Sequence, residues 1–257
     1  MAIADADNMK DGATDNEYIK LIIEEGVSSK NPVILEGFPG IGLVGNIVAT
    51  QIASELKMKQ IGTIESRLFP PITVLYEGIV HAPVRIYEDT QNEFIVVLSD
   101  ILIHPMTAYD IGKAITSWAQ SLNARLNIPI AGIATMREQR TVFAAATGAE
   151  QLNLVKDKTE TLVTGSISGI AGSLMNESYI SKLPALCLLG ETQGPTPDPR
   201  AAARVIDVIN DLLKLNISTQ KLVEEADQIE TELHKLAEQV QGAEQVETKG
   251  PTQVMYG

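Results

Sequence analysis

The sequence predicts an α/β layered fold with a mixed, mostly parallel β-sheet. Between about residue 18 and residue 215, short apolar runs of strand length alternate with longer stretches of helical periodicity. This alternation is typical of a largely parallel sheet covered by helices. The stretch from 73 to 89 differs, because two β-rich runs follow each other with only a turn between them. We therefore expect the sheet to contain an antiparallel part.

The individual elements follow from the same patterns. Apolar runs that end at Gly, Pro or polar clusters predict strands at 33–38, 61–66, 93–100, 128–136 and 183–192. Apolar residues at spacings of three and four predict helices at 41–56, 107–126 and 198–215. At 257 residues and 44% hydrophobic composition, the chain is long enough for one large domain, with or without an appendage.

Composition and charge exclude several classes of function. A net charge of −13 disfavours a nucleic-acid partner, because phosphate binding needs clustered Lys and Arg. The single cysteine, Cys187, lies in an apolar run and has no partner for an internal disulfide, which fits a reducing cytoplasm. Residues 1–16 are acidic and polar, so we expect a disordered leader and no export signal. No apolar run approaches the roughly 20 residues that span a bilayer.

A separate helix is expected at 217–241, after the α/β domain of 17–216. Its apolar residues recur at alternating spacings of four and three, while acidic residues occupy the other faces. This pattern is an a/d seam of under three heptads, so the helix needs something to pack on. Two interpretations stay open: packing on its own domain, or self-association. The seam consists of Leu222, Ala226, Ile229, Leu233, Leu236 and Val240.

The last segment, 242–257, shows no apolar periodicity and is expected to be a flexible tail. As a flexible chain, its roughly 16 residues would have an end-to-end distance of about 20–25 Å. It ends in Met255, Tyr256 and Gly257. A terminal carboxylate can pair with a lysine, a tyrosine adds aromatic area and a hydroxyl, and a methionine fills irregular apolar grooves. These three residues are therefore candidate partner-binding residues.

A glycine-rich segment is the strongest candidate for a small-molecule site. Gly40, Gly42 and Gly45 match G-x-G-x-x-G after a predicted strand, with Gly37 just before them and Glu65 about twenty residues on. This is the pattern of a dinucleotide-binding loop, in which the acid would hold a ribose hydroxyl. Against it, Pro39 removes an N–H donor, two β-rich runs stand after Glu65 where the next strand-helix repeat is expected, and no second nucleotide-contacting element is evident. The alternative is that the glycines allow a tight turn and close packing of the helix on the sheet.

The other candidates for catalysis are weaker. Asp100 and His104 follow a predicted strand, where α/β folds build sites, but no nucleophile completes a triad. Ser166 and Ser168 do not match the nucleophile elbow G-x-S-x-G. The histidines at 81, 104 and 234 lack metal-ligand spacing. We therefore expect no catalytic residues, no metal and no cofactor.

Four segments resemble one family, the proteasome assembly chaperones, and in particular its archaeal members. They are VILEGFPGIGLVGNIVATQIASEL, SDILIHPMTAYDIGKAI, TGSISGIAGSLM and PALCLLGET. The resemblance covers most of residues 30–215. It implies a three-layer α/β/α sandwich similar to the nucleoside phosphorylase/hydrolase fold, a homo-oligomer, and a structural role without nucleotide for the EGFPGIGLVG block.

The same resemblance implies a role for the tail. Archaeal members often end in a hydrophobic residue, a tyrosine and any last residue, and Met255, Tyr256 and Gly257 match this motif. It implies docking between α-subunits of the proteasome core particle, in assembly or in opening of the gate. No Walker-type G-x-x-x-x-G-K-[ST] is present, so the expected function is ATP-independent.

Two alternatives of another class remain at this point. A phosphorylase- or hydrolase-like enzyme would use Asp100, His104 and the loop from Gly40 to Gly45, and nucleosides or phosphate would stabilise it against heat. A dinucleotide-binding protein would respond to NAD in the same way. The binding interpretation instead predicts loss of function when Met255–Gly257 is removed.

Overall fold

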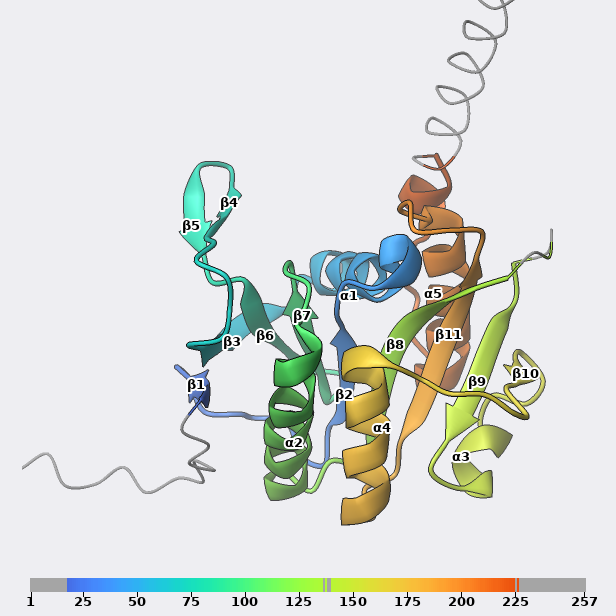
Figure 1. Ribbon diagram of the computed structural model, residues 1–257, viewed down its shortest axis with the longest axis horizontal. Coiled ribbons are helices and arrows are strands. Elements are labelled where there is room, and N and C mark those ends of the chain that lie inside the picture. The colour runs from blue at the N-terminus through green and yellow to red at the C-terminus, as the bar shows by residue number, and fades with distance from the viewer. Residues whose placement is uncertain (1–17, 136, 138–139, 225, 227–257) are drawn as a thin grey trace, which may run out of the picture.

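The computed structural model describes residues 18–135, 137, 140–224 and 226. Its centre is a nine-stranded mixed sheet with the strand order β1-β3-β6-β7-β2-β8-β11-β9-β10 (Figure 1). A separate two-stranded sheet pairs β4 (Val74–Tyr76) with β5 (Ile79–His81). The strands of the large sheet are β1 (Ile19–Ile23), β2 (Val33–Gly37), β3 (Lys59–Ser66), β6 (Val84–Asp89), β7 (Phe94–Ser99), β8 (Leu126–Ala134), β9 (Val142–Ala146), β10 (Glu160–Thr161) and β11 (Leu186–Thr192).

The sheet is parallel at its centre and mostly antiparallel towards its edges. β7, β2, β8 and β11 run parallel to one another, and β10 runs parallel to β9. The pairings of β1 with β3, β3 with β6, β6 with β7, and β9 with β11 are antiparallel. The expectation of a mixed sheet is confirmed. The expectation of a mostly parallel one is wrong, because four of the eight strand pairings in the described sheet are antiparallel.

Helices cover both faces of the sheet and make the three layers visible in Figure 1. α1 (Val44–Glu55) and α5 (Pro199–Leu213) pack on one face, and α2 (Pro105–Ser121) and α4 (Gly169–Ser181) on the other. Side chains of β2 alternate between the two cores, since Leu35 joins the cluster under α1 and α5 while Ile34 joins the one under α2. The short α3 (Ala149–Asn153) lies beside β9.

The starts of two helices follow from local sequence. His104 and Asp198 each accept a backbone N–H at the first turn, from Met106 and Ala201 respectively. A proline comes next in both cases, where its missing N–H is harmless. This is why α2 and α5 begin at Pro105 and Pro199, close to the predicted boundaries.

Several elements differ from the sequence prediction. β1, β9, α3 and β10 were not predicted, and each is at most five residues long. The longer helix α4 was not among the predicted helices either. The stretch from 73 to 89 holds three strands instead of two. Pro83 separates β5 from β6, so the first two strands leave the large sheet and form a projecting hairpin.

The seam of the predicted C-terminal helix begins inside the domain. A helical segment starts after Ser218, and Leu222 and Ala226 are each only 4% exposed. Leu222 belongs to the core cluster under α1 and α5. The remaining seam positions, Ile229, Leu233, Leu236 and Val240, lie outside the described residues.

One acidic side chain lies in the middle of the sheet. Glu36 of β2 is 1% exposed, and neither carboxyl oxygen has a hydrogen-bond partner among the described residues. Removal from water raises the pKa of Glu36 well above its ordinary value. The sequence gives no warning of this, because a single glutamate in a strand normally indicates a solvent-facing position.

Candidate functional site

The glycine-rich loop follows β2 and lies at the carboxyl edge of the parallel strands. A 3-10 turn, Ile41–Leu43, leads directly into α1. A Cβ atom on Gly45 would lie 2.7 Å from the backbone oxygen of Ile130 and 2.8 Å from that of Phe38. A Cβ on Gly37 would collide with Ala49 and the backbone of Gly45. These two glycines therefore let the start of α1 pack against the sheet.

The middle of the glycine-rich loop contacts the end of β11 and the start of α5. Gly42 has a φ of +65°, and a Cβ there would lie 2.9 Å from the hydroxyl of Thr192. Its carbonyl oxygen accepts the backbone N–H of Asp198 at 2.9 Å. Gly40 is different, since nothing lies within 4 Å of its Cβ position. The contacts made by Gly42 support the packing interpretation over a phosphate cradle.

Glu65 does not complete a dinucleotide site. It lies on β3, and β6 and β7 separate that strand from β2 in the sheet (Figure 1). A dinucleotide-binding fold needs the acid at the end of the strand adjacent to the glycine loop. The structure therefore does not bring Glu65 together with Gly40, Gly42 and Gly45.

Asp100 and His104 both have structural partners. Asp100 forms an ion pair with Arg85 at 2.6 Å and accepts a hydrogen bond from the hydroxyl of Tyr76 at 2.9 Å. His104 caps α2 by accepting the N–H of Met106 through Nδ1 at 3.2 Å. No contact joins Asp100 to His104 among the described residues, so the geometry does not support the acid–base pair of the enzyme alternative.

Charged side chains form ion pairs near the carboxyl ends of β8 and β11. Buried Glu191 accepts the hydroxyl of Thr135 and the backbone N–H of Thr141, and it forms an ion pair with Arg137 at 3.2 Å. Arg140 forms an ion pair with Asp198 at 3.1 Å. The two arginines link the loop after β8 to β11 and to the start of α5.

The hairpin of β4 and β5, which we call the arm (residues 74–81), projects beyond the body of the molecule (Figure 1). Its turn consists of Glu77 and Gly78, with φ values of 50° and 82°. Positive φ at both central residues is the geometry of a tight two-residue hairpin turn. Leu75, Ile79 and Val80 are 61%, 64% and 67% exposed, so the arm presents a largely apolar surface to solvent.

A buried cation joins the arm to the body of the protein through Tyr76, the residue before the turn. Arg85 of β6 is 1% exposed and donates hydrogen bonds to the hydroxyls of Tyr87 and Tyr76 and to the carbonyl of Ala82. Its guanidinium also lies 5.0 Å from the centre of the Tyr76 ring. Burial and the hydrogen bond to Asp100 raise the pKa of Tyr76. Sequence reasoning missed this network, because its members are separated along the chain.

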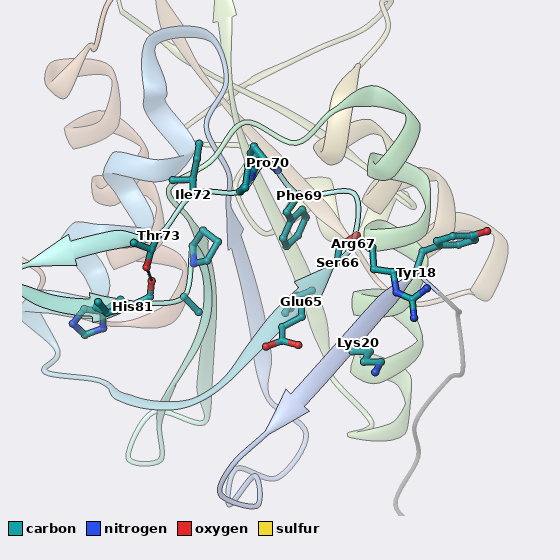
Figure 2. A pocket seen from close by; sticks show the side chains of 15 residues that line it. Tyr18, Lys20, Glu65, Ser66, Arg67, Phe69, Pro70, Ile72, Thr73 and His81 are labelled. Carbon is teal, nitrogen blue, oxygen red and sulfur yellow. Dashed lines mark hydrogen bonds between the residues drawn. The ribbon is translucent and has the colours of Figure 1, made fainter.

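A groove of about 800 Å³ lies between the base of the arm and the strands β1 and β3, and we call it the arm groove. Figure 2 shows Tyr18, Lys20, Glu65 and Arg67 at one side of it and Thr73 and His81 at the other. Its apolar lining comes largely from Phe69, Pro70, Pro71 and Ile72 in the segment after β3, together with Ile64 of β3 itself.

Other predicted features can be placed only in part. The tail residues Met255, Tyr256 and Gly257 lie outside the described residues. The described part of the chain contains no cluster of three His, Cys, Asp or Glu side chains suited to a metal ion. None of its helices combines the length and the apolar character needed to cross a membrane. Cys187 is buried, and desolvation raises the pKa of its thiol to about 12.

Comparison with known proteins decides the family. The model of the PAC2 family matches residues 34–237. This chain belongs to the PAC2 family. A curated relative, an uncharacterized protein of Methanocaldococcus jannaschii, is 33% identical over 223 residues, which cover 87% of this chain and 92% of that protein.

Solved structures support the same assignment. The crystal structure of Pyrococcus furiosus PbaA, an archaeal homolog of proteasome-assembly chaperone, superposes with a TM-score of 0.80 at 34% identity. The match covers 90% of this chain and 97% of PbaA. P. furiosus PbaB, an archaeal proteasome activator, shares the fold with a TM-score of 0.76 at 24% identity, covering 86% of this chain and 99% of PbaB. The predicted similarity to the nucleoside phosphorylase fold stays untested by these matches.

Proposed function

We propose that this PAC2-family protein is an ATP-independent proteasome assembly chaperone or activator. The observation that carries the proposal is the likeness to PbaA, which extends over 90% of the chain at 34% identity. The site geometry supports a binding function over the nucleotide-dependent alternative. Close packing of α1 and its preceding loop explains the glycines at 37, 42 and 45. Structural contacts likewise account for Asp100, which pairs with Arg85, and for His104, which caps α2.

The proposed docking element is the tail, with Gly257 as the last residue. Met255 and Tyr256 would fill an apolar pocket between adjacent α-subunits of the core particle, and the terminal carboxylate would pair with a lysine there. A single tail of three contact residues binds weakly, because it buries little surface and loses conformational freedom. Several tails on one homo-oligomer raise the effective concentration of each after the first has docked.

The test is surface plasmon resonance of the intact protein on an immobilised archaeal core particle. Tyr256→Ala and a variant with one extra residue after Gly257 should both lose binding, because each removes one feature of the tail. Tyr179→Ala is the matched control, since Tyr179 is a 70% exposed tyrosine on α4 of the folded body. It should bind like the unmodified chain.

Two outcomes contradict the proposal. If all variants bind alike, a surface other than the tail contacts the core particle. If none binds, the proteasome is not the partner, and thermal stabilisation by nucleosides, phosphate or NAD becomes the next measurement. A response to those ligands would favour the enzyme alternative.

A further inference from the structure

The arm is an unusual feature for the surface of a protein that acts alone. An isolated two-stranded hairpin is marginally stable in water. This one exposes Leu75, Ile79 and Val80 by more than 60% each, and Ile72 at its base by 55%. Exposed apolar surface gathered in this way marks a contact site for another macromolecule.

The orientation of the arm is built into the fold. Tyr76 in β4 is held by Asp100 at 2.9 Å and by Arg85 at 3.1 Å, and the two charged groups lie 2.6 Å apart. Arg85 is almost fully buried, and a buried cation is retained only where several partners compensate its desolvation. The network therefore fixes the arm relative to the body, while Leu75, Ile79 and Val80 stay exposed to solvent.

The arm groove offers a complementary surface on the same chain. Its apolar lining includes Phe69, Pro70 and Ile72, and its volume of about 800 Å³ is large enough for several side chains. Because the base of the arm itself forms one wall, the groove lies at the root of the arm, while the tip points away from it (Figures 1 and 2). A second copy of the chain can supply the tip.

Charge complementarity selects a second copy as the occupant. The chain carries a net charge of −13, so two copies repel each other over most of their surfaces. Lys20 and Arg67 nevertheless place two exposed cations at the arm groove, against one acid, Glu65. The turn at the arm tip carries one acid, Glu77, which is also exposed. Docking of the tip would bring Glu77 to the two cations.

We propose that the arm tip of one copy inserts into the arm groove of the next, with Leu75 and Ile79 against its apolar lining and Glu77 beside Lys20 and Arg67. Tip and groove are different surfaces of one chain, so the contact is head-to-tail. Such a contact builds a closed ring when its rotation closes, and an open chain when it does not. This interface is independent of whether the tail docks on a proteasome.

Site-directed cross-linking tests the contact directly. The single natural cysteine, Cys187, is buried, so introduced cysteines react against a clean background. The full-length variant Glu77→Cys with Arg67→Cys, oxidised mildly with copper phenanthroline, should give a ladder of dimers, trimers and larger species on non-reducing gels. Glu77→Cys with Glu150→Cys is the control, because Glu150 is an exposed acid on α3, beside β9 near the other edge of the sheet.

Charge reversal tests the same contact without a cross-link. Glu77→Lys replaces one non-glycine residue of the turn by another and reverses its charge. Light scattering coupled to gel filtration should then show self-association weakened by about tenfold. Adding Lys20→Glu and Arg67→Glu to that variant should restore the original mass. Three results would each overturn the proposal. They are an unmodified chain that is monomeric, a cross-linked ladder no stronger than that of the control, and a charge swap that does not restore self-association. In those cases a different protein would be the occupant of the groove.

Discussion

Replacement of Gly45 by alanine separates the packing role of the glycine loop from a phosphate-binding role. The new Cβ would lie 2.7 Å and 2.8 Å from the backbone oxygens of Ile130 and Phe38, neither of which can rotate away. Overpacking of this kind costs about 1–3 kcal/mol. The better helix propensity of alanine offsets at most about 1 kcal/mol. The expected net loss of stability is about 1–2 kcal/mol.

Gly40→Ala is the matched control within the same motif. Gly40 has an extended backbone, with φ at −159°, and nothing lies within 4 Å of its Cβ position. Its stability should therefore change by less than about 0.5 kcal/mol. Urea unfolding followed by circular dichroism measures both variants, and Gly45→Ala should also lower the Tm by roughly 2–8 °C.

The outcome of this pair can refute the reasoning. Equal stability of the two variants would mean that α1 moves away from the sheet without cost, and the close packing would then not explain the motif. Loss of a ligand-dependent thermal shift in Gly40→Ala, with unchanged stability, would instead show that the backbone at Gly40 approaches a bound phosphate.

Two further substitutions test buried groups. Because burial raises the pKa of Glu36 in the folded state, the folded protein holds its proton more tightly, and stability falls as the pH rises above the unfolded value of about 4.3. Glu36→Gln should remove this fall and stabilise the protein by about 1–3 kcal/mol at neutral pH. If the free energy of unfolding, measured by chemical unfolding, changes with pH in the same way in both proteins, the prediction is wrong. Asp198→Ala should cost about 1–2 kcal/mol, because the side chain caps α5 at 3.0 Å from the N–H of Ala201. Asp198→Asn keeps a cap and should lose less, and equal losses in urea unfolding would refute the capping role.

Sequence patterns predicted the elements whose signal is local. The buried parallel strands β2, β7, β8 and β11 are continuous apolar runs, and the helices that begin at Pro105 and Pro199 carry caps and clear periodicity. The edge strands were harder to predict. β1 alternates between buried and exposed positions over only five residues, and β10 has two residues, both exposed. Their pairing depends on neighbours far along the chain.

The candidate sites were predictable to different degrees. The glycine motif was visible in sequence, but its role depends on the distance between Gly45 and the carbonyl of Ile130, which belongs to a strand more than eighty residues away. The arm was predicted as strand and turn, yet its separation from the large sheet was not. The contacts of Tyr76 with Arg85 and Asp100 join the arm to the body, and no local pattern encodes such a meeting.

The two proposals make a joint prediction, because multivalent docking requires linked copies. If the arm contact joins the copies, Glu77→Lys should weaken binding to an immobilised core particle although Met255–Gly257 is unchanged. Tethering can raise the overall affinity by 10²–10⁴ without new contacts, so a loss of about tenfold or more is expected. Glu150→Lys carries the same charge change and should bind normally. If Glu77→Lys becomes monomeric and still binds as tightly as the unmodified chain, each tail acts alone, and the arm contact serves a purpose other than presenting tails together.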